Sequence, residues 1–368
     1  MSRVPGENAA RCHFNPLNNM PPMRPGRVAV VPLCLFAAAL LAGCGGGSKA
    51  STTSVVAKGS PAPTPSEFPS ASGKSLKQVL QTAKGRSDLL LAPTTEALYP
   101  GPSRYSFEIF SRERVLVTDA KVAIYLAKAP AKTRNGRKGK KTPKPLGNPA
   151  IGPFPASVES LGTKPAFSSS TTAEDPTAAP VVYAAEPSFP ADGEWRVLAL
   201  VKEGKINKWT VLPTVTVGEF TMIPRVGQRA PLIHTPTAAS VGGELAKITT
   251  RVPPDSQNQV DYASVLGKEP IVLLFATPKF CQSRTCSPVV DVAEQVKRHY
   301  GNRAAFIHME IYNDNNPSKG VRAQVRTFHL PSVPWLFVIN RDGTIGSEIA
   351  GGFGVEKLTQ LVKKAIGE

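Results

Sequence analysis

The distribution of hydrophobic positions predicts an α/β domain in the C-terminal part of the chain, residues 226–368. Residues 271–276 form an uninterrupted apolar run, which is typical of a strand covered on both faces. A run of small and polar residues that includes two cysteines follows it. Apolar residues then recur at helical or strand spacing. Helices are predicted at 288–300, 319–328 and 355–366, and strands at 304–312, 335–340 and 345–350.

The part before it, residues 86–220, has the pattern of short strands. Apolar alternation or β-branched residues predict strands at 104–110, 121–127, 181–186, 194–200 and 209–217. No long helical pattern interrupts them, so a β-sandwich is expected. This part resembles the small immunoglobulin-like modules of bacterial envelope proteins. It contains neither cysteine nor histidine, so we expect no metal or nucleophilic site within it.

The N-terminal segment has the pattern of a targeting signal. Residues 28–41 are uncharged and follow two arginines, and the run is shorter than the ~20 residues of a membrane-spanning helix. It ends in the sequence LAGC, which resembles the lipobox of bacterial lipoproteins, and the resemblance implies lipidation of Cys44. We therefore predict a signal peptide at 1–43 and anchoring at the extracytoplasmic side of the cell membrane. Residues 44–85 are rich in Ser, Pro and Gly, which predicts a flexible tether with one short helix at 75–84.

Charge adds one further feature, a basic insertion at residues 128–145. The chain has a formal net charge of +17, and the insertion holds eight Lys and Arg residues with no acidic residue. It is interpreted either as a solvated loop or as a contact with anionic lipid headgroups. A nucleic-acid partner is not expected, because no aromatic residue is interleaved for base stacking.

Processing reduces the five cysteines to one pair. Cys12 and Cys34 fall within the predicted signal peptide, and Cys44 is assigned to the lipid. Cys281 and Cys286 remain, in a compartment where disulfides persist. Three interpretations stay open for the pair: a redox-active dithiol, a structural disulfide and a metal site.

The order of elements around this pair resembles the thioredoxin-like fold. The cysteines follow the first central strand, "SVPW" precedes the final hairpin, and "VGQRAP" resembles the entry segment of the redoxin branch. The resemblance implies that Pro334 is a cis-proline beside the cysteines and that the backbone of Val333 pairs with substrate. It also implies that Cys281 attacks and Cys286 resolves. Phe280 and Trp335 are the further candidates for substrate contact.

The spacing of the two cysteines departs from the family's C-x-x-C. A disulfide requires Cα atoms ~4.4–6.8 Å apart, which two positions deep in one helix cannot provide at this spacing. We expect Ser287 to cap a helix that begins at Pro288, leaving both cysteines in the loop. A helix that begins near Cys281 and is kinked at Pro288 is the alternative. Lys279 and Arg284, with the helix dipole, are expected to favour thiolate.

Other positions also differ from the family. Phe280 stands where thioredoxins often have Trp, and Leu273 stands where they have a buried acid. Glu310 either replaces that acid or, as we favour, faces solvent from its strand. Thr277 is one residue too distant from Cys281 for the peroxiredoxin motif, so a peroxidase is weakly supported.

These observations favour a lipid-anchored, extracytoplasmic thiol–disulfide oxidoreductase that acts on cysteine-containing envelope proteins without a cofactor. The alternatives are a copper carrier that uses Cys281, Cys286 and His329, and a redox-inert scaffold. Soft thiolates suit Cu(I). His308 and His329 are otherwise interpreted as an ordinary strand residue and an ordinary helix-end residue.

Overall fold

The computed structural model describes residues 57–130 and 147–368. The described residues all belong to one compact unit, Ser54–Glu368. The predicted signal peptide, the lipidation site Cys44 and most of the basic insertion lie outside the described residues. Within the described ranges, no helix is both long and apolar enough to span a membrane.

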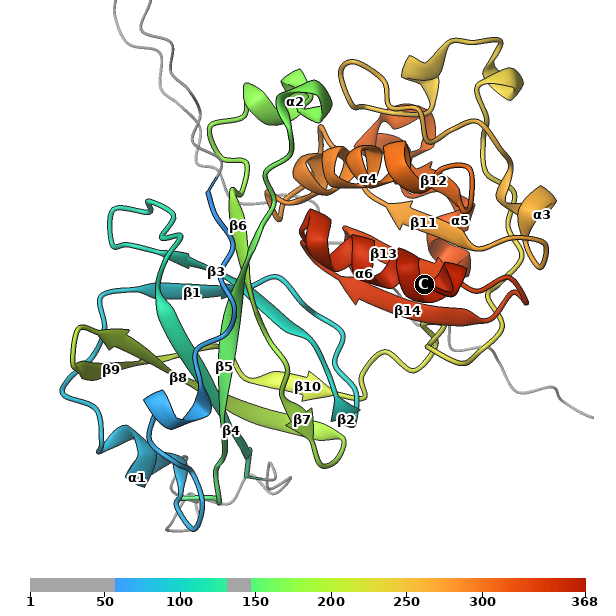
Figure 1. Cartoon of the computed structure of the whole chain (residues 1–368). Helices are drawn as coiled ribbons and strands as arrows, with labels where there is room; N and C mark the ends of the chain where they lie inside the picture. The colour runs from blue at the N-terminus through green and yellow to red at the C-terminus, as the bar shows by residue number, and fades with distance from the viewer. Residues whose placement is uncertain (1–56, 131–146) are drawn as a thin grey trace, which may run out of the picture. The chain divides into compact units, whose positions relative to one another are not determined.

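The strands of the N-terminal part form one curled sheet with the order β1-β3-β6-β5-β4-β8-β10, and β9 pairs with β8 (Figure 1). We call residues 57–130 and 147–218 the β-module. Hydrogen-bonded pairing is continuous along this order, so an immunoglobulin-like sandwich is not confirmed. The strands are β1 (Leu90–Pro93), β3 (Tyr105–Phe110), β4 (Lys121–Lys128), β5 (Ile151–Ser160), β6 (Val181–Ala185), β8 (Gly193–Glu203), β9 (Ile206–Val211) and β10 (Val215–Val217), with a small ribbon of β2 (Gly101–Pro102) and β7 (Ser188–Phe189).

Proline explains two differences from the predicted strands. Strand β5 is ten residues long, but its sequence contains Pro153 and Pro155, which break the usual strand pattern, and it was missed. The single strand predicted at 209–217 is two strands, and Pro213 lies in the interval between them.

Residues 57–85 are packed, which corrects the expectation that they belong to a flexible tether. Helix α1 (Leu76–Leu80) is capped by Ser75, whose hydroxyl accepts a hydrogen bond from the Gln78 amide. Its Leu76 and Val79 are fully buried, in a cluster with Phe68 and residues of β4 and β8. Apolar residues widely spaced among Ser and Pro thus cover one face of the sheet.

The C-terminal part, which we call the α/β domain (residues 226–368), has the predicted thioredoxin-like topology. Its sheet has the order β12-β11-β13-β14, and β11 is parallel to β12 and antiparallel to β13. The strands are β11 (Ile271–Phe275), β12 (Ala305–Met309), β13 (Trp335–Ile339) and β14 (Ile345–Ala350). The helices are α3 (Tyr262–Val265), α4 (Cys286–Tyr300), α5 (Ala323–Thr327) and α6 (Val355–Ile366).

Strand β11 is buried on both faces, as its continuous apolar run predicts. Val272 and Leu274 pack in the core that contains residues of α4 and α6. Leu273 and Phe275 pack in the opposite core, where the rings of Phe275 and Phe328 have centroids 5.0 Å apart. The strand thereby fixes the position at which the cysteine loop leaves the sheet.

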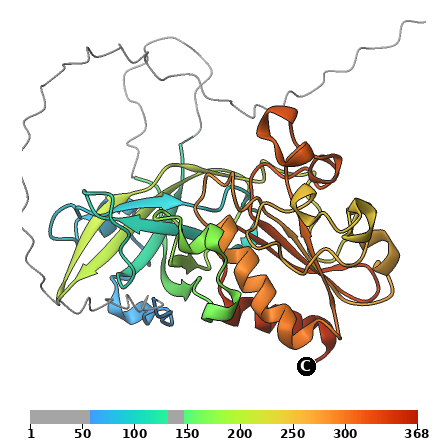
Figure 2. The ribbon, with the colours of Figure 1, turned by 90° about the horizontal axis from the view of Figure 1, so that it is seen from above.

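The connection between β5 and β6 leaves the sheet of the β-module and reaches α4. It contains α2 (Ser170–Ala173), drawn in green beside α4 in Figure 2. The hydroxyl groups of Thr172 and Ser287 are 2.7 Å apart. Two segments that are distant in sequence therefore meet at the N-terminal turn of α4.

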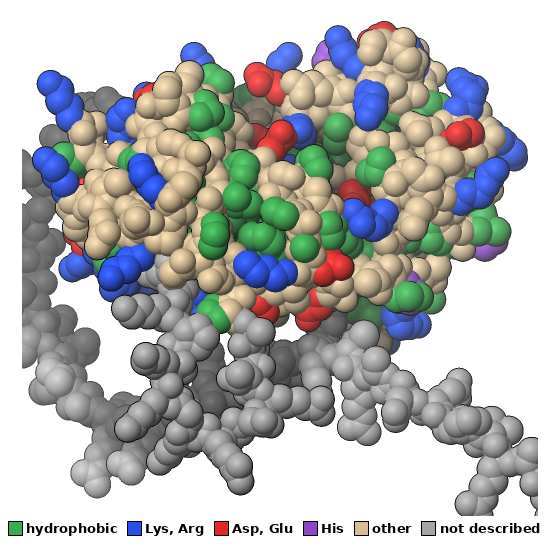
Figure 3. Space-filling view, turned by 90° about the horizontal axis from the view of Figure 1, so that it is seen from below, with side chains coloured by type: hydrophobic (Ala, Val, Ile, Leu, Met, Phe, Trp, Pro, Cys, Tyr) green, Lys and Arg blue, Asp and Glu red, His purple; other side chains and the backbone are tan. Residues whose placement is uncertain are grey.

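The Lys and Arg side chains of the described residues are spread out on the face that Figure 3 shows. Hydrophobic side chains gather near the middle of this face, and Lys and Arg side chains are scattered across it. The Lys and Arg side chains of the described residues therefore do not form a single basic patch on this face.

Candidate redox site

Cys281 and Cys286 form a disulfide between the end of β11 and the start of α4. Their Cα atoms are 5.8 Å apart, within the usual range for a disulfide. The helix begins at Cys286, so the prediction that Ser287 caps it is wrong, as is the alternative start near Cys281. No side chain caps the helix at Thr285; instead, the Cys286 amide donates to Sγ of Cys281 at 3.3 Å. The sulfur thus accepts from the first amide of the helix, one residue before Ser287.

The two sulfur-bearing residues differ in exposure. Cys286 is fully buried in the core formed with α4 and α6, whereas Cys281 is only half-buried. An external thiol or disulfide therefore reaches Cys281 more readily. This asymmetry suits a pair in which Cys281 exchanges with a partner and Cys286 resolves.

Two hydroxyl groups beside Cys281 were missed by the sequence analysis. Oγ of Ser283 lies 3.2 Å from Sγ of Cys281 and 3.0 Å from Oγ1 of Thr285. A hydroxyl that donates to sulfur stabilises the thiolate relative to the thiol. Their position between the two cysteines is the one feature of the sequence that indicates a place near the sulfurs.

The segment that precedes β13 lies against the cysteine loop. The Val333–Pro334 peptide is cis, and the Val333 carbonyl oxygen lies 3.4 Å from Oγ of Ser283. Val333 is half-buried, but the Trp335 side chain is 1 % exposed and lies in the core. The predicted contact of Trp335 with substrate is corrected, because its side chain does not reach the surface.

Phe280 is half-buried and packs beside Tyr312. The two ring centroids are 6.1 Å apart, and the Lys279 ammonium lies 5.8 Å from the Phe280 ring. Lys279 itself is exposed. Among the predicted contact residues, Phe280 and Val333 are thus the two with accessible surface.

Glu310 is fully buried, so the prediction that it faces solvent is wrong. One carboxylate oxygen accepts hydrogen bonds from the amide and the hydroxyl of Thr250, both at 3.0 Å. The Thr250 hydroxyl also accepts from the Lys279 amide at 3.1 Å. Because β12 ends at Met309, the alternation that would have pointed Glu310 outward no longer applies.

His308 forms a buried ion pair with Asp255. Its Nδ1 is 2.9 Å from a carboxylate oxygen of Asp255, and its Nε2 is 3.2 Å from the Ala276 carbonyl oxygen. Burial opposes the charge on the ring, but the carboxylate of Asp255 outweighs it and raises the pKa of His308 to about 9. Burial likewise opposes the charge on Asp255, yet the imidazolium lowers its pKa to about 2. The pair holds Ala276, where the cysteine loop begins.

His329 is exposed and follows α5, with its backbone at a φ of 52°. Across residues 57–130 and 147–368, the structure brings no three His, Cys, Asp or Glu residues together as a candidate metal site. His329 therefore does not join Cys281 and Cys286 in a ligand group in this structure.

The β-module contacts the loop between the cysteines. The Arg284 carbonyl accepts a hydrogen bond from the Ala179 amide at 3.0 Å. The Arg284 guanidinium lies 5.1 Å from the Phe110 ring centroid. Glu108, two residues before Phe110 on β3, is buried. Burial raises the pKa of Glu108 to about 7, while the charge of Arg284 acts in the opposite direction.

A second contact of the β-module lies at the loop between β14 and α6. Arg104 donates to the Gly352 carbonyl at 2.9 Å and pairs with Glu159 at 3.1 Å. Glu159 accepts a hydrogen bond from the Gly354 amide at 3.3 Å. Thr285 also lies close to Gly352, so this loop adjoins the cysteine loop.

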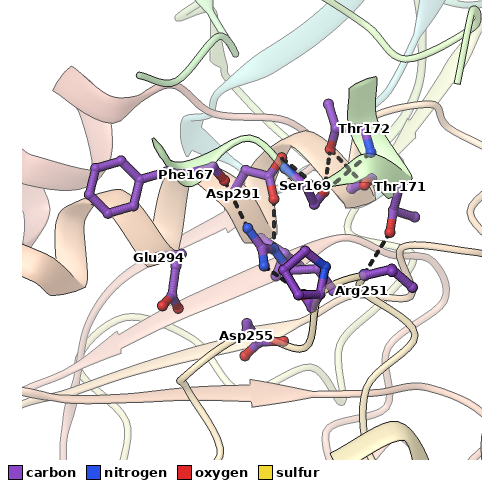
Figure 4. Close-up of polar contacts among 12 residues, drawn as sticks. Phe167, Ser169, Thr171, Thr172, Arg251, Asp255, Asp291 and Glu294 are labelled. Atoms are coloured by element: carbon purple, nitrogen blue, oxygen red, sulfur yellow. Dashed lines mark hydrogen bonds and ion pairs between the residues drawn. The ribbon is translucent and has the colours of Figure 1, made fainter. Parts of the chain in front are cut away.

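A third contact is a buried polar cluster on α4, shown in Figure 4. Asp291 accepts from Nε of Arg251 at 2.8 Å, and from the amide and hydroxyl of Ser169 at 3.0 and 3.1 Å. Arg251 also donates to the carbonyl of Phe167 at 2.8 Å. The connection between β5 and β6 is thereby tied to the helix that carries Cys286.

Comparison with known proteins gives limited similarity. No family model and no curated protein matches the chain. A thiol:disulfide interchange protein of the thioredoxin family from Chlorobium tepidum TLS is 20% identical, covers 39% of this chain and 98% of its own, and has a TM-score of 0.27. A thioredoxin-like protein solved in the oxidized form is 16% identical, covers 30% of this chain and 86% of its own, and has a TM-score of 0.24. The fold assignment therefore rests on the sheet order and helix placement described above.

Proposed function

We propose that the protein is a thiol–disulfide oxidoreductase. The observation that supports this most directly is the Cys281–Cys286 disulfide at the start of α4, with one half-buried and one fully buried cysteine. A purely structural disulfide that closes so short a loop contributes little stability through chain entropy. Val333, which is half-buried, lies beside Ser283, and Oγ of Ser283 is 3.2 Å from Sγ of Cys281.

The exchange proceeds in two steps from the reduced pair. The Cys281 thiolate attacks a disulfide of the partner, forms a mixed disulfide and releases one partner thiolate. The Cys286 thiolate then attacks Sγ of Cys281, closes the internal disulfide and releases the second partner thiolate. Two electrons pass from the protein to the partner, and the reverse sequence oxidises a partner dithiol. The Ser283 hydroxyl and the Cys286 amide stabilise negative charge on Cys281.

We also propose that this exchange takes place outside the cytoplasmic membrane, on cysteine-containing envelope proteins. The support is the apolar run at 28–41 followed by Cys44 in LAGC, which lies outside the described residues. Cys44→Ala is expected to release the protein from the membrane fraction. Retention of the variant in that fraction would contradict the lipid anchor.

The exchange activity is tested with Cys281→Ser and Cys286→Ser. The wild-type protein should exchange disulfides with a model protein, and Cys281→Ser should abolish the reaction. Cys286→Ser should accumulate the mixed disulfide, which mass spectrometry detects. A reduction potential below about −300 mV, together with no exchange, would instead assign the pair as a structural disulfide.

A further inference from the structure

Strand β3 has two buried faces with different roles. Tyr105, Phe107 and Ile109 belong to the core of the β-module. Glu108 and Phe110 alternate with them and face the cysteine loop, where Arg284 lies. One strand of the β-module therefore presents a set of side chains to the site of the disulfide.

Arg284 is held in an unfavourable backbone conformation. Its φ is 61°, in the left-handed region that residues with a Cβ seldom adopt. Such a conformation persists when surrounding contacts hold it. Two of these contacts come from the β-module: the Ala179 amide on the Arg284 carbonyl, and the Phe110 ring beside the guanidinium.

Glu108 adds a charge that changes near neutral pH. Glu108 is 4 % exposed, and its Oε1 atom has no hydrogen-bond partner among the described residues. Burial raises its pKa to about 7. Arg284 is the charged group that faces it, so protonation of Glu108 alters the electrostatic environment of the guanidinium between the two cysteines.

We propose that Phe110 and Glu108 are positioning residues of the redox site: through Arg284 they hold the loop that closes the Cys281–Cys286 disulfide. This inference rests on the proposed function, and it assigns two residues of the β-module to the redox site. Contacts that are stronger in the disulfide form than in the dithiol form stabilise the disulfide by the difference in their free energies. Weakening them shifts the equilibrium toward the dithiol.

The first test is the equilibrium of the pair in glutathione redox buffers, followed by trapping of free thiols and mass spectrometry. Phe110→Leu keeps an apolar side chain but removes the aromatic face. It should shift the equilibrium toward the dithiol by about threefold, which corresponds to about 14 mV. Phe110→Tyr should restore the wild-type value. Trp209→Leu is the matched control, because Trp209 stacks with Arg86 at 5.8 Å elsewhere in the β-module.

Arg284→Gly tests whether Phe110 acts on the disulfide–dithiol equilibrium through Arg284. Glycine adopts a φ of 61° without strain, so the loop keeps its shape while the guanidinium is removed. In this background, Phe110→Leu should cause no further shift. An equal shift in both backgrounds would show that Phe110 acts on stability in general and would overturn the proposed role of Arg284.

Glu108→Gln tests the electrostatic part through the pH profile of alkylation of Cys281 in the reduced protein. Above pH 7 the wild-type carboxylate offsets the charge of Arg284, so its removal should make the Cys281 thiol more acidic. Glu203→Gln, on β8, is the control. If Phe110→Leu and Glu108→Gln both leave the equilibrium and the profile unchanged, the inference is wrong. The disulfide–dithiol equilibrium is measured in glutathione buffer, without a protein partner. Its outcome is therefore independent of the exchange assay that tests the oxidoreductase function.

Discussion

Cys281 and Cys286 belong to one disulfide but have different surroundings. Sγ of Cys281 accepts from the Cys286 amide and lies 3.2 Å from Oγ of Ser283, and Cys281 is partly accessible, whereas Cys286 is enclosed by the core. Hydrogen bonds to a charged group contribute more than those between neutral groups. For the proposed exchange, Ser283 and burial therefore give the two sulfurs different surroundings.

Ser283→Ala should make the Cys281 thiol less acidic, since a hydrogen bond to a charged acceptor is worth about 1.5–3 kcal/mol. We expect its pKa to rise by about one unit, measured from the pH dependence of alkylation in the reduced protein. Ser283→Thr keeps the hydroxyl and should behave as the wild type. An unchanged profile in Ser283→Ala would exclude the hydroxyl as a donor to the thiolate.

The ion pair of His308 and Asp255 makes stability depend on pH. The folded pKa of His308, about 9, lies above its usual value of ~6.5, so its contribution is complete below pH 6.5 and is lost as pH rises through 9. The pKa of Asp255 is lowered to about 2, so its contribution is complete above its usual value of ~3.9 and is lost as pH falls toward 2.

His308→Gln should destabilise the protein by about 3 kcal/mol at pH 6, because it leaves a buried carboxylate without its ion-pair partner. It should also remove the loss of stability between pH 6.5 and 9. Denaturant unfolding at several pH values measures both effects. The exposed His299 serves as the control in His299→Gln, which should match the wild type. A pH dependence that persists in His308→Gln would assign it to other groups.

At the scale of elements, packing decides which segments fold against the sheets. Helix α1 contains five residues, far fewer than an isolated helix needs in water. It is stable because Leu76 and Val79 are buried against the β-module. Residues 57–85 therefore stabilise the sheet, despite a composition typical of a linker.

Leu76→Ala should lower the free energy of unfolding by about 2–5 kcal/mol, the usual cost of such a truncation in a core. Lys77→Ala, on the exposed side of the same helix, should have little effect. Thermal or denaturant unfolding compares the two variants. Equal stability of both would restore the original interpretation of this segment as a tether.

The sequence predicts the α/β domain more completely than the site. The apolar run of β11 and the stripe of α6 follow from local periodicity, and β13, β14 and α6 agree closely with the predicted ranges. Glu310, Glu108 and Ala179 acquire their roles from contacts between segments distant in sequence, which no local pattern encodes. Helix α4 starts at Cys286 rather than at the predicted Pro288, and its first amide donates to the Cys281 sulfur, a contact that local pattern does not encode.

At the scale of the described unit, the β-module and the α/β domain share buried polar contacts. The Arg251–Asp291 pair is almost completely buried, with side chains 6% and 1% exposed, and it binds Ser169 and Phe167 of the β-module. Charges buried in this way are stable only with their partners.

Arg251→Met should destabilise the protein by about 3–5 kcal/mol, since it leaves Asp291 charged and buried. The double variant Arg251→Met with Asp291→Leu should recover part of this loss, because no unpaired charge remains. Chemical denaturation of the three proteins measures the difference. If the double variant is less stable than Arg251→Met, the cluster stabilises the structure by more than charge compensation.

The bond between Arg104 and Gly352 joins residues 248 positions apart, whereas the two cysteines are five positions apart. Closing a long chain segment costs more entropy than closing a short one, and distant contacts form more slowly. The sulfurs can therefore meet early, whereas the contact between Arg104 and the Gly352 carbonyl forms only after the last strand is in place. The two cysteines can pair before the surroundings of their loop are complete. Oxidants and isomerases present during folding would then meet the cysteine pair in surroundings that differ from those of the folded protein.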